Sequence, residues 1–339
     1  MKENLSVIKN VDNRDWEAFI RGHPQGNIFQ SPQFYEVHRQ TKNYEPVVLA
    51  VMDETGNLHA ILQSVLIREL NGPIGSLSSH AVIEGGPLFS EGKMDSEVMS
   101  VLLKEYDRIA EKSCLYSEIR NKNDTSNMKS LFHESGYEFV DHLNFLIDLR
   151  KTKEELWRQI SRSMRKNINK SLKKGVEVEE MDNKNLIPTF YGFLQDVYRS
   201  VGIPLPDISH FYSIYELLVP KEMAKFHLAK YNGEYVGGRL SLLFDGRIHA
   251  YFVGVPEKYK KLNVNPLLNW HIIEWGFDNG YSTFDFGGAG KPEKDYGVRE
   301  FKRQFGGELV NFGRYSKIHS PIKMKLAEKG FKIYKKMLM

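Results

Sequence analysis

Two dipeptides, Asn232-Gly233 and Asp245-Gly246, constrain the fold of this chain more than any other feature. Each lies between runs that are rich in β-branched and aromatic residues. Asn-Gly and Asp-Gly favour a type I′ turn, because both central residues of that turn need a positive φ, and the turn joins antiparallel strands. The pattern therefore predicts a three-stranded antiparallel meander with strands over 226–231, 234–244 and 247–255.

A helix and a short strand follow the meander. Apolar side chains recur at helical spacing from Leu267 to Gly276, Pro266 suits a first helical turn, and Gly280 ends the helix. Residues 281–286 then predict a strand. A meander, a helix and a strand parallel to the last meander strand resemble the core of the N-acyltransferase (GNAT-like) fold. That resemblance implies an acyl-donor site where the two parallel strands separate.

The loop before this helix differs from that of acetyl-CoA enzymes with the same fold, which is rich in glycine. Residues 259–266 read Tyr-Lys-Lys-Leu-Asn-Val-Asn-Pro and contain no glycine. Because glycine allows a backbone to approach a diphosphate closely, its absence predicts either a different donor or a rebuilt loop. The candidate donor-binding residues of the loop and the preceding strands are Asn263, Asn265, Arg239, Val253 and Val255.

Length and composition indicate about two globular domains in a reducing compartment. The chain has 339 residues, a formal net charge of +4 and one cysteine, Cys114. A single cysteine excludes a disulfide framework. No apolar run in the sequence is long enough to cross a bilayer, and the N-terminus does not resemble a signal peptide. We therefore predict a cytoplasmic protein.

The first 149 residues repeat the order of elements found around the meander. Ser31 is a natural N-cap with Pro32 in the first turn. A hairpin then follows from Tyr44, and after it come a helix over 94–112, a strand over 115–120, a helix over 128–135 and a strand over 139–149. We therefore predict an α+β protein with two tandem GNAT-like domains, each a mixed, mainly antiparallel sheet flanked by helices. The predicted domains are 1–149 and 150–317.

One stretch at the start of the second predicted domain is strongly basic. Thr152 and Glu155 form a capping box and Gly175 suits a C′ position, so one helix is predicted from Thr152 to Lys174. From Ser161 to Lys174 there are six basic residues and no acid. One side of the helix is an apolar rib of Leu156, Ile160, Met164, Ile168 and Leu172, and the other carries Arg162, Lys166, Lys170 and Lys173, with Arg165 at the boundary.

The basic face has two interpretations. It is either the solvated side of a surface helix or a binding site for a polyanion such as a phosphate ester, a diphosphate or RNA. Surface helices usually mix Glu with Lys to gain pairs four residues apart, which favours the second interpretation. Guanidinium geometry suits oxyanions, so Arg165 is the best phosphate ligand, with Arg162 and Lys166 beside it.

The tail over 318–339 is predicted to be a basic helix. Its charge is compatible with packing on the first domain, with peripheral contact at the inner membrane, or with RNA binding. We expect it to pack on the first domain.

Four motifs occur in an order typical of one enzyme family. They are Phe29-Gln-Ser-Pro-Gln-Phe-Tyr-Glu-Val, the basic stretch ending in Gly175-Val, Asn265 to Tyr281 followed by Phe284-Asp-Phe-Gly-Gly, and Gly297-Val-Arg-Glu-Phe-Lys-Arg-Gln-Phe-Gly-Gly. In this order they resemble the FemAB-like family, the non-ribosomal peptidyltransferases that add amino acids to peptidoglycan precursors. The match spreads over most of the chain, and the ordered set is more specific than any one motif.

The resemblance implies an N-acyltransferase that moves an aminoacyl group from tRNA onto an amine of a lipid- or nucleotide-linked cell-envelope precursor. Relatives with the same motifs use acyl-CoA, so an acyl-CoA-dependent enzyme of surface polysaccharide biosynthesis is the main alternative. The motif lysine falls on Lys302, where it would stabilise charge on the donor or on the tetrahedral intermediate. Tyr251 falls near substrate-contacting tyrosines. His38 stands where peptidoglycan-type members commonly have lysine.

Direct attack by the acceptor amine is the expected mechanism, because no Ser-His-Asp or Cys-His arrangement is visible for covalent catalysis. Besides Lys302, Arg303 and backbone amides near 253–255 would stabilise the oxyanion. Asp285 is a candidate base, with capping of the following Gly-Gly turn as the equal alternative. Tyr296 and Arg299 belong to the same segment. No Cys/His cluster suggests a metal, so the expected co-substrate is aminoacyl-tRNA or acyl-CoA.

A third hypothesis is a non-enzymatic RNA-binding module that uses the face over 162–174. It would need aromatic side chains among the basic ones for stacking, and that stretch has none. The glycine-free loop argues against acyl-CoA, whereas the Pro-rich 204–212 loop lacks the substrate-binding arginine of peptidoglycan-type members. We slightly favour aminoacyl-tRNA as the donor.

Overall fold

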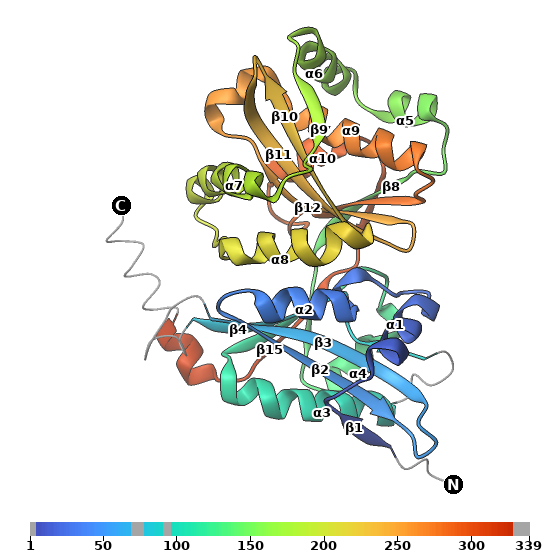
Figure 1. The fold of residues 1–339 in the computed structure, drawn as a ribbon. Helices are drawn as coiled ribbons and strands as arrows, with labels where there is room; N and C mark the ends of the chain where they lie inside the picture. The colour runs from blue at the N-terminus through green and yellow to red at the C-terminus, as the bar shows by residue number, and fades with distance from the viewer. Residues whose placement is uncertain (1–4, 69–77, 91–95, 328–339) are drawn as a thin grey trace. The chain divides into compact units, whose positions relative to one another are not determined.

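The computed structural model describes residues 5–68, 78–90 and 96–327 (Figure 1). Contacts divide the chain into two compact units, Met1–Asp141 with Phe312–Met339 and His142–Asn311. Each unit is built on a mixed sheet flanked by helices. The predicted fold class, two tandem GNAT-like domains of α+β type, is confirmed.

The sheet of the first unit has the order β1-β2-β3-β4-β6-β15-β7, with β5 pairing β3. β4 and β6 are parallel, and α2 and α3 lie on opposite sides of the sheet (Figure 1). The strands are β1 Ser6–Ile8, β2 Tyr44–Met52, β3 Leu58–Arg68, β4 Ser79–Glu84, β5 Leu88–Phe89, β6 Tyr116–Arg120, β7 Glu138–Val140 and β15 Arg314–Ile318. The helices are α1 Asn13–Gly22, α2 Pro32–Gln40, α3 Ser96–Ser113 and α4 Lys129–Glu134.

The sheet of the second unit has the order β14-β8-β13-β12-β11-β10-β9. In Figure 1, α9 covers one face, and α7 and α8 cover the other. The strands are β8 Leu143–Asp148, β9 Glu177–Glu180, β10 Ala224–Tyr231, β11 Glu234–Phe244, β12 Arg247–Gly254, β13 Thr283–Gly288 and β14 Glu308–Asn311. The helices are α5 Lys153–Gln159, α6 Arg162–Lys173, α7 Ile187–Val201, α8 Ile208–Leu218, α9 Val264–Asp278 and α10 Gly297–Arg303.

The predicted meander is confirmed. Strands β10, β11 and β12 pair antiparallel. Both turn dipeptides have positive φ, at 51° and 83° for Asn232-Gly233 and at 45° and 69° for Asp245-Gly246. These values are what a type I′ turn requires. β13 then runs parallel to β12, as the order of elements predicted.

The prediction of a single helix from Thr152 to Lys174 is wrong. The structure has two helices in this stretch, α5 and α6. Ser161 is the N-cap of α6, and its hydroxyl accepts a hydrogen bond from the Met164 N–H. The Ser161 N–H in turn donates to the Gln304 carbonyl at 2.7 Å. The break is therefore fixed by a contact with a residue far along the chain, which local pattern does not reveal.

Other element predictions need correction. The strand predicted over 139–149 is two strands in different sheets, β7 and β8, with the polar pair Asp141-His142 between them. Leu172, in the last turn of α6, is 51% exposed, so it is not part of the buried rib. The tail becomes helical only at 321 because β15 extends to Ile318. Residues 328–339 of the predicted tail helix lie outside the described residues, as do residues 94 and 95 of the predicted 94–112 helix.

Close packing of α7 on β12 depends on glycine at position 254. A Cβ on Gly254 would lie 2.8 Å from the Phe193 carbonyl carbon and 2.9 Å from the Leu194 nitrogen, both backbone atoms of α7. We expect Gly254→Ala to lower the free energy of unfolding by about 1–3 kcal/mol, because backbone cannot yield as a side chain can.

The matched control is Gly192→Ala, inside α7 itself. A Cβ there meets nothing within 4 Å, so this change should raise stability by about 0.5–1 kcal/mol through helix propensity. Urea denaturation of both variants measures the difference. If both variants changed the free energy of unfolding in the same direction, the packing explanation would be wrong.

Candidate functional site

The two parallel strands of the second sheet separate partway along their length. β12 and β13 pair only over residues 247–249 and 283–285, although β12 continues to Gly254 and β13 to Gly288. Beyond the paired residues, each strand has backbone that is not used in pairing with the other. The resemblance to the N-acyltransferase fold implies that an acyl donor binds where these two strands separate.

β12 also bulges at this point. The β11 partners of Ala250 and Phe252 are adjacent residues, so Tyr251 is the extra residue of the bulge. The Tyr251 hydroxyl lies 3.1 Å from Nε2 of His210 on α8. His210 is fully buried, and burial lowers its pKa to about 3, so the imidazole is neutral at physiological pH.

Asp285 lies at the point of separation and is 3% exposed. Its Oδ1 accepts hydrogen bonds from Nδ2 of Asn144 at 2.8 Å and from the Gly287 N–H at 2.7 Å. Its Oδ2 is 3.0 Å from Nδ1 of His249. An ionised carboxylate can only accept, so Nδ1 carries the proton. These contacts join β8, β12 and β13 and hold the turn at the end of β13.

Lys302, on α10, reaches the same end of β13. Its Nζ lies 2.6 Å, 3.0 Å and 2.8 Å from the carbonyl oxygens of Phe286, Gly287 and Gly288. An ammonium group has three N–H donors, so these three carbonyls match its capacity. The contacts fix a positive charge where β12 and β13 separate.

The other candidates of this segment have different environments. Arg299 is 7% exposed, and its guanidinium donates to carbonyl groups of the loop over 291–294. It therefore orders the loop that leads into α10. Arg303 is exposed and pairs with Glu300 at 3.1 Å, and Tyr296 is 40% exposed.

The glycine-free loop forms a 3-10 helix over Glu257–Leu262, and Asn263 follows it with φ 57° and ψ 39°. Asparagine is one of the few residues that tolerates this left-handed conformation, so Asn263 supplies the turn without glycine. Asn265 accepts two hydrogen bonds at 2.8 Å from Nδ2 of Asn269. Oδ1 of Asn269 accepts from Nη1 of Arg239 at 2.8 Å.

Arg239 is a buried cation beneath the N-terminal half of α9. It is 3% exposed, and its guanidinium carbon lies 5.5 Å from the centre of the Phe284 ring. Burial lowers its pKa to about 9, which still leaves it protonated at neutral pH. Among the described residues, no carboxylate forms an ion pair with it. Val253 and Val255 are partly buried and pack against the same core.

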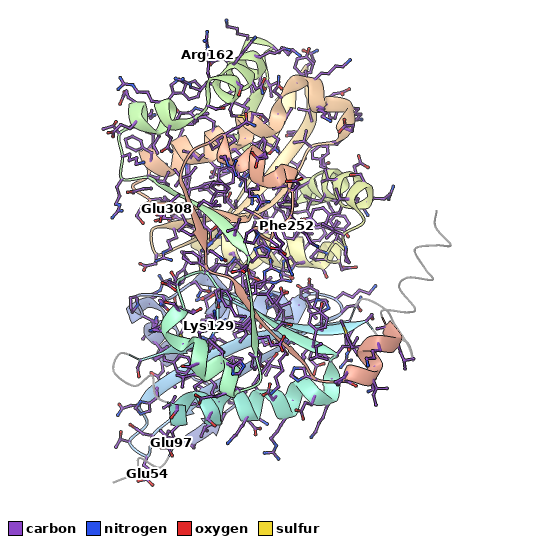
Figure 2. All side chains as sticks on the ribbon, turned by 180° about the vertical axis from the view of Figure 1, so that it is seen from behind. Glu54, Glu97, Lys129, Arg162, Phe252 and Glu308 are labelled. Atoms are coloured by element: carbon purple, nitrogen blue, oxygen red, sulfur yellow. The ribbon has the colours of Figure 1, made fainter. Side chains whose placement is uncertain are left out.

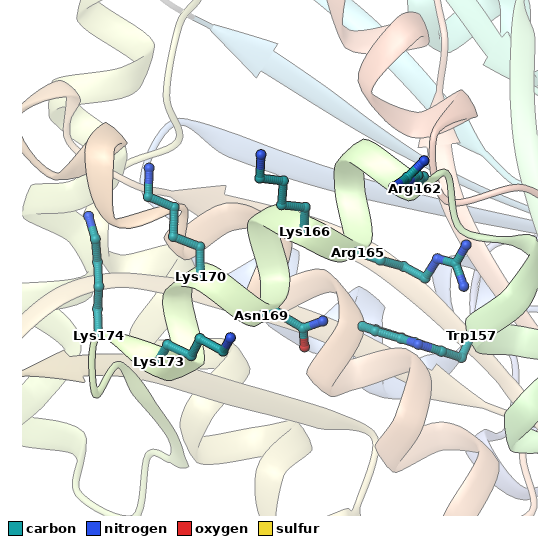
Figure 3. Close-up of a pocket in the computed structure, with 8 residues that line it drawn as sticks. All are labelled: Trp157, Arg162, Arg165, Lys166, Asn169, Lys170, Lys173 and Lys174. Carbon is teal, nitrogen blue, oxygen red and sulfur yellow. The ribbon is translucent and has the colours of Figure 1, made fainter.

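The basic face of α6 lines a hollow of about 630 Å³. Figure 3 shows its lining: Trp157 from α5, and Arg162, Arg165, Lys166, Asn169, Lys170, Lys173 and Lys174 from α6 and its C-cap. Figure 2 shows Arg162 at the outer surface of the second unit. Nζ of Lys174 donates to the Lys261 carbonyl at 2.7 Å, so the end of this basic face is joined to the glycine-free loop.

His38 belongs to the first unit. It is 7% exposed on α2 and packs against Phe34, with ring centres 4.8 Å apart, and against Tyr44 at 5.7 Å. The candidates of the second unit form three groups: Asp285 with Lys302 at the strand separation, Arg239 with Asn265 under α9, and Arg162, Arg165 and Lys166 on α6.

Sequence reasoning missed several residues of these groups: Asn144, His249, Asn269 and Trp157. Asn144 and His249 are polar residues with an apolar residue on each side, and this is the only local signal they carry. Their proximity to Asp285 depends on strand register, which the sequence pattern leaves open.

Two buried histidines, His210 and His227, predict that the second unit loses stability in acid. Burial lowers the pKa of His210 and of His227 to about 3, from an ordinary value of 6.5. Between these values the unfolded chain binds a proton at each imidazole and the folded unit does not, so unfolding is favoured as pH falls. We expect His227→Phe to lower the slope of unfolding free energy against pH by about one proton. Urea denaturation from about pH 4.5 to 6.5 measures it, and an unchanged slope would contradict the assignment.

Comparisons with known proteins agree with this fold. A family described as "Acetyltransferase (GNAT) domain" matches residues 160–303. The chain is similar to the lipid II:glycine glycyltransferase of Staphylococcus haemolyticus, with 23% identity over 88% of this chain and 89% of that protein. It is also similar to the lipid II:glycine glycyltransferase of Staphylococcus aureus, with 21% identity over 87% and 89%.

Solved structures are similar in fold. FemX has a TM-score of 0.69 at 16% identity, covering 92% of this chain and 97% of that one. L-PGS from Bacillus licheniformis has a TM-score of 0.59 at 16% identity, with 95% and 97% covered. A tandem GNAT protein from the clavulanic acid biosynthesis pathway has 0.63 at 10% identity, with 94% and 99% covered.

The fold is that of tandem GNAT proteins, and the family match places an acetyltransferase (GNAT) domain over residues 160–303. The predicted resemblance to the FemAB-like enzymes is confirmed by relatives that match nearly nine-tenths of the chain. Within the described ranges, no helix is both long and apolar enough to cross a membrane. In the same ranges, no three His, Cys, Asp or Glu side chains converge as a set of metal ligands.

Proposed function

We propose that this protein transfers an amino acid from aminoacyl-tRNA onto an amine of a lipid-linked cell-envelope precursor, in the cytoplasm. The observation that carries the proposal is the one-sign basic face of α6, which Lys174 joins to the loop before α9. An RNA donor presents a phosphate at every nucleotide, so a row of cations adds affinity in proportion to the contacts made. The glycyl transfer to lipid II named for the relatives supports the class of acceptor.

The reaction forms an amide bond and breaks the ester bond to the ribose of the donor. The acceptor amine attacks the ester carbonyl, and the proton it loses balances the proton gained by the leaving ribose oxygen. Negative charge develops on the carbonyl oxygen in the intermediate. We assign its stabilisation to the fixed charge of Lys302 and to backbone amides of β12 beyond the bulge at Tyr251.

We assign Asp285 the role of an anchor rather than a base. Its two carboxylate oxygens are occupied by contacts with Asn144, Gly287 and His249, and the side chain is 3% exposed. This anchor holds the end of β13 in place beside the separation of β12 and β13. Positioning of this kind contributes to catalysis because misplaced groups lose much of their effect.

The test supplies the purified protein with lipid II and either mixed radiolabelled aminoacyl-tRNA or acyl-CoA. We expect label to reach lipid II from aminoacyl-tRNA in a saturable way. Arg165→Ala with Lys166→Ala should raise the donor KM, whereas Lys184→Ala should not, because Lys184 is an exposed lysine paired with Glu216. Transfer from acyl-CoA alone would overturn the proposal in favour of a CoA enzyme. RNA binding with no transfer from either donor would favour the non-enzymatic alternative.

A further inference from the structure

The hollow on α6 contains an aromatic side chain that the basic sequence stretch itself lacks. Trp157 comes from α5, on the other side of the helix break at Ser161. Figure 1 shows that α5 and α6 run in different directions, and Trp157 lines the same hollow as the α6 cations. Figure 3 shows the indole on the side of α6 that carries Arg165 and Asn169. The break thus adds a flat apolar surface to the basic face.

The Trp157 ring is held in place from the core side. It packs edge-on against Trp270, with ring centres 4.8 Å apart and an interplanar angle of 61°. It is partly buried and belongs to the margin of the hydrophobic core. Among the described side chains, no lysine or arginine stacks on it. A rigid indole of this kind can receive a planar ligand at little cost in conformational entropy.

The polar groups around the ring favour an anionic ligand with hydrogen-bonding edges. The lining contains no acid, and Arg165 is partly buried beside the ring whereas Lys170 and Lys173 are exposed. Asn169 offers one amide acceptor and two N–H donors. An aromatic platform, an amide and surrounding cations are what a nucleotide requires: stacking for the base, hydrogen bonds for its edge and charge for its phosphates.

We propose that this hollow is a subsite for one unpaired nucleotide of the donor RNA, near its aminoacylated 3′ end. The base stacks on Trp157, the Asn169 amide contacts the base edge, and Arg165 with the lysines of α6 holds the phosphates. Lys174 joins this face to the loop before α9, so the strand can continue toward the separation of β12 and β13. The inference rests on the proposed RNA donor, but it concerns binding rather than transfer.

The experiment measures binding of two fluorescent RNA minihelices, one with a four-nucleotide unpaired 3′ end and one blunt, across a salt series. We expect Trp157→Leu to weaken binding of the first by at least about fivefold, the loss of one stacked base, with the salt slope unchanged. Trp157→Phe should keep most of the affinity. Asn169→Ala should weaken the same RNA by a smaller factor. Arg165→Ala should weaken both RNAs and reduce the salt slope by about one.

Thermal melting of each variant checks that the fold is retained, and Lys184→Ala is the matched surface control. Unaltered binding of the unpaired end by a folded Trp157→Leu protein would overturn the proposal. Equal losses of binding for the blunt and unpaired RNAs in Trp157→Leu would also overturn it, as would displacement of the RNA by acyl-CoA or by anionic vesicles at equal charge. Because this experiment measures binding, a Trp157-dependent preference for the RNA with the unpaired end, without transfer of an amino acid, would contradict the proposed function and leave the subsite standing.

Discussion

Lys302→Ala is expected to lower kcat/KM for acyl transfer by about 100-fold or more, the usual effect of removing one group that stabilises an oxyanion. Lys302 places its ammonium among three carbonyl oxygens at the end of β13. Loss of this ammonium removes the only charged side chain to which we assign stabilisation of the donor's carbonyl oxygen. It also releases the turn that the three hydrogen bonds hold.

Two companion variants accompany Lys302→Ala. Lys302→Met keeps an unbranched apolar side chain of similar length and removes the ammonium together with its three hydrogen bonds, so its melting temperature reports whether the turn is lost. Lys184→Ala removes an exposed lysine of the same unit and should leave the rate unchanged. Steady-state kinetics at saturating acceptor, with thermal melting alongside, is the measurement. A Lys302→Met enzyme that melts normally and keeps the wild-type rate would refute the assigned role.

Asp285→Ala is expected to destabilise the second unit by about 3–5 kcal/mol, because it leaves several buried polar groups without their partner. The change removes the acceptor used by Asn144, His249 and the Gly287 N–H, all at the centre of the sheet. A loss of this size should lower the melting temperature by roughly 10 °C in a unit of this length. Calorimetry or urea denaturation measures it.

Asp285→Asn distinguishes the anchor from the base. Asparagine keeps an acceptor for the Gly287 N–H, and His249 can present its other tautomer to the new amide. We therefore expect a smaller loss of stability and substantial remaining activity. A folded Asp285→Asn protein with abolished transfer would instead identify Asp285 as the base, the alternative that the sequence left open.

Local chemistry explains which parts of the fold were predictable. The turns at Asn232-Gly233 and Asp245-Gly246 need positive φ at neighbouring residues, and the sequence meets that need with the residue types that tolerate it. The break before α6 was not predictable in this way, because it depends on a hydrogen bond from Ser161 to Gln304. β14 and β15 escaped prediction because they are short and pair with strands more than 150 residues earlier.

Some residues of the site were likewise predictable from local motifs, and others were not. Lys302 and Asp285 stand in motifs that mark them as candidates, and the structure places both at the end of β13. Their partners on β8 and β12 are brought to them by strand register, which no local spacing encodes. Trp157 lies outside the basic stretch 162–174, so the pattern of that stretch gives no sign of it. The ring reaches the basic face from outside that stretch.

The path of the chain through the first sheet has a consequence for synthesis. β15 lies between β6 and β7, yet it is translated after the entire second unit. While the ribosome makes residues 142–311, β6 and β7 each lack a neighbour and expose strand edges that favour association with other chains. The second unit has all of its strands before β15 emerges. The N-terminal unit is therefore the first to leave the ribosome and the last to complete its sheet.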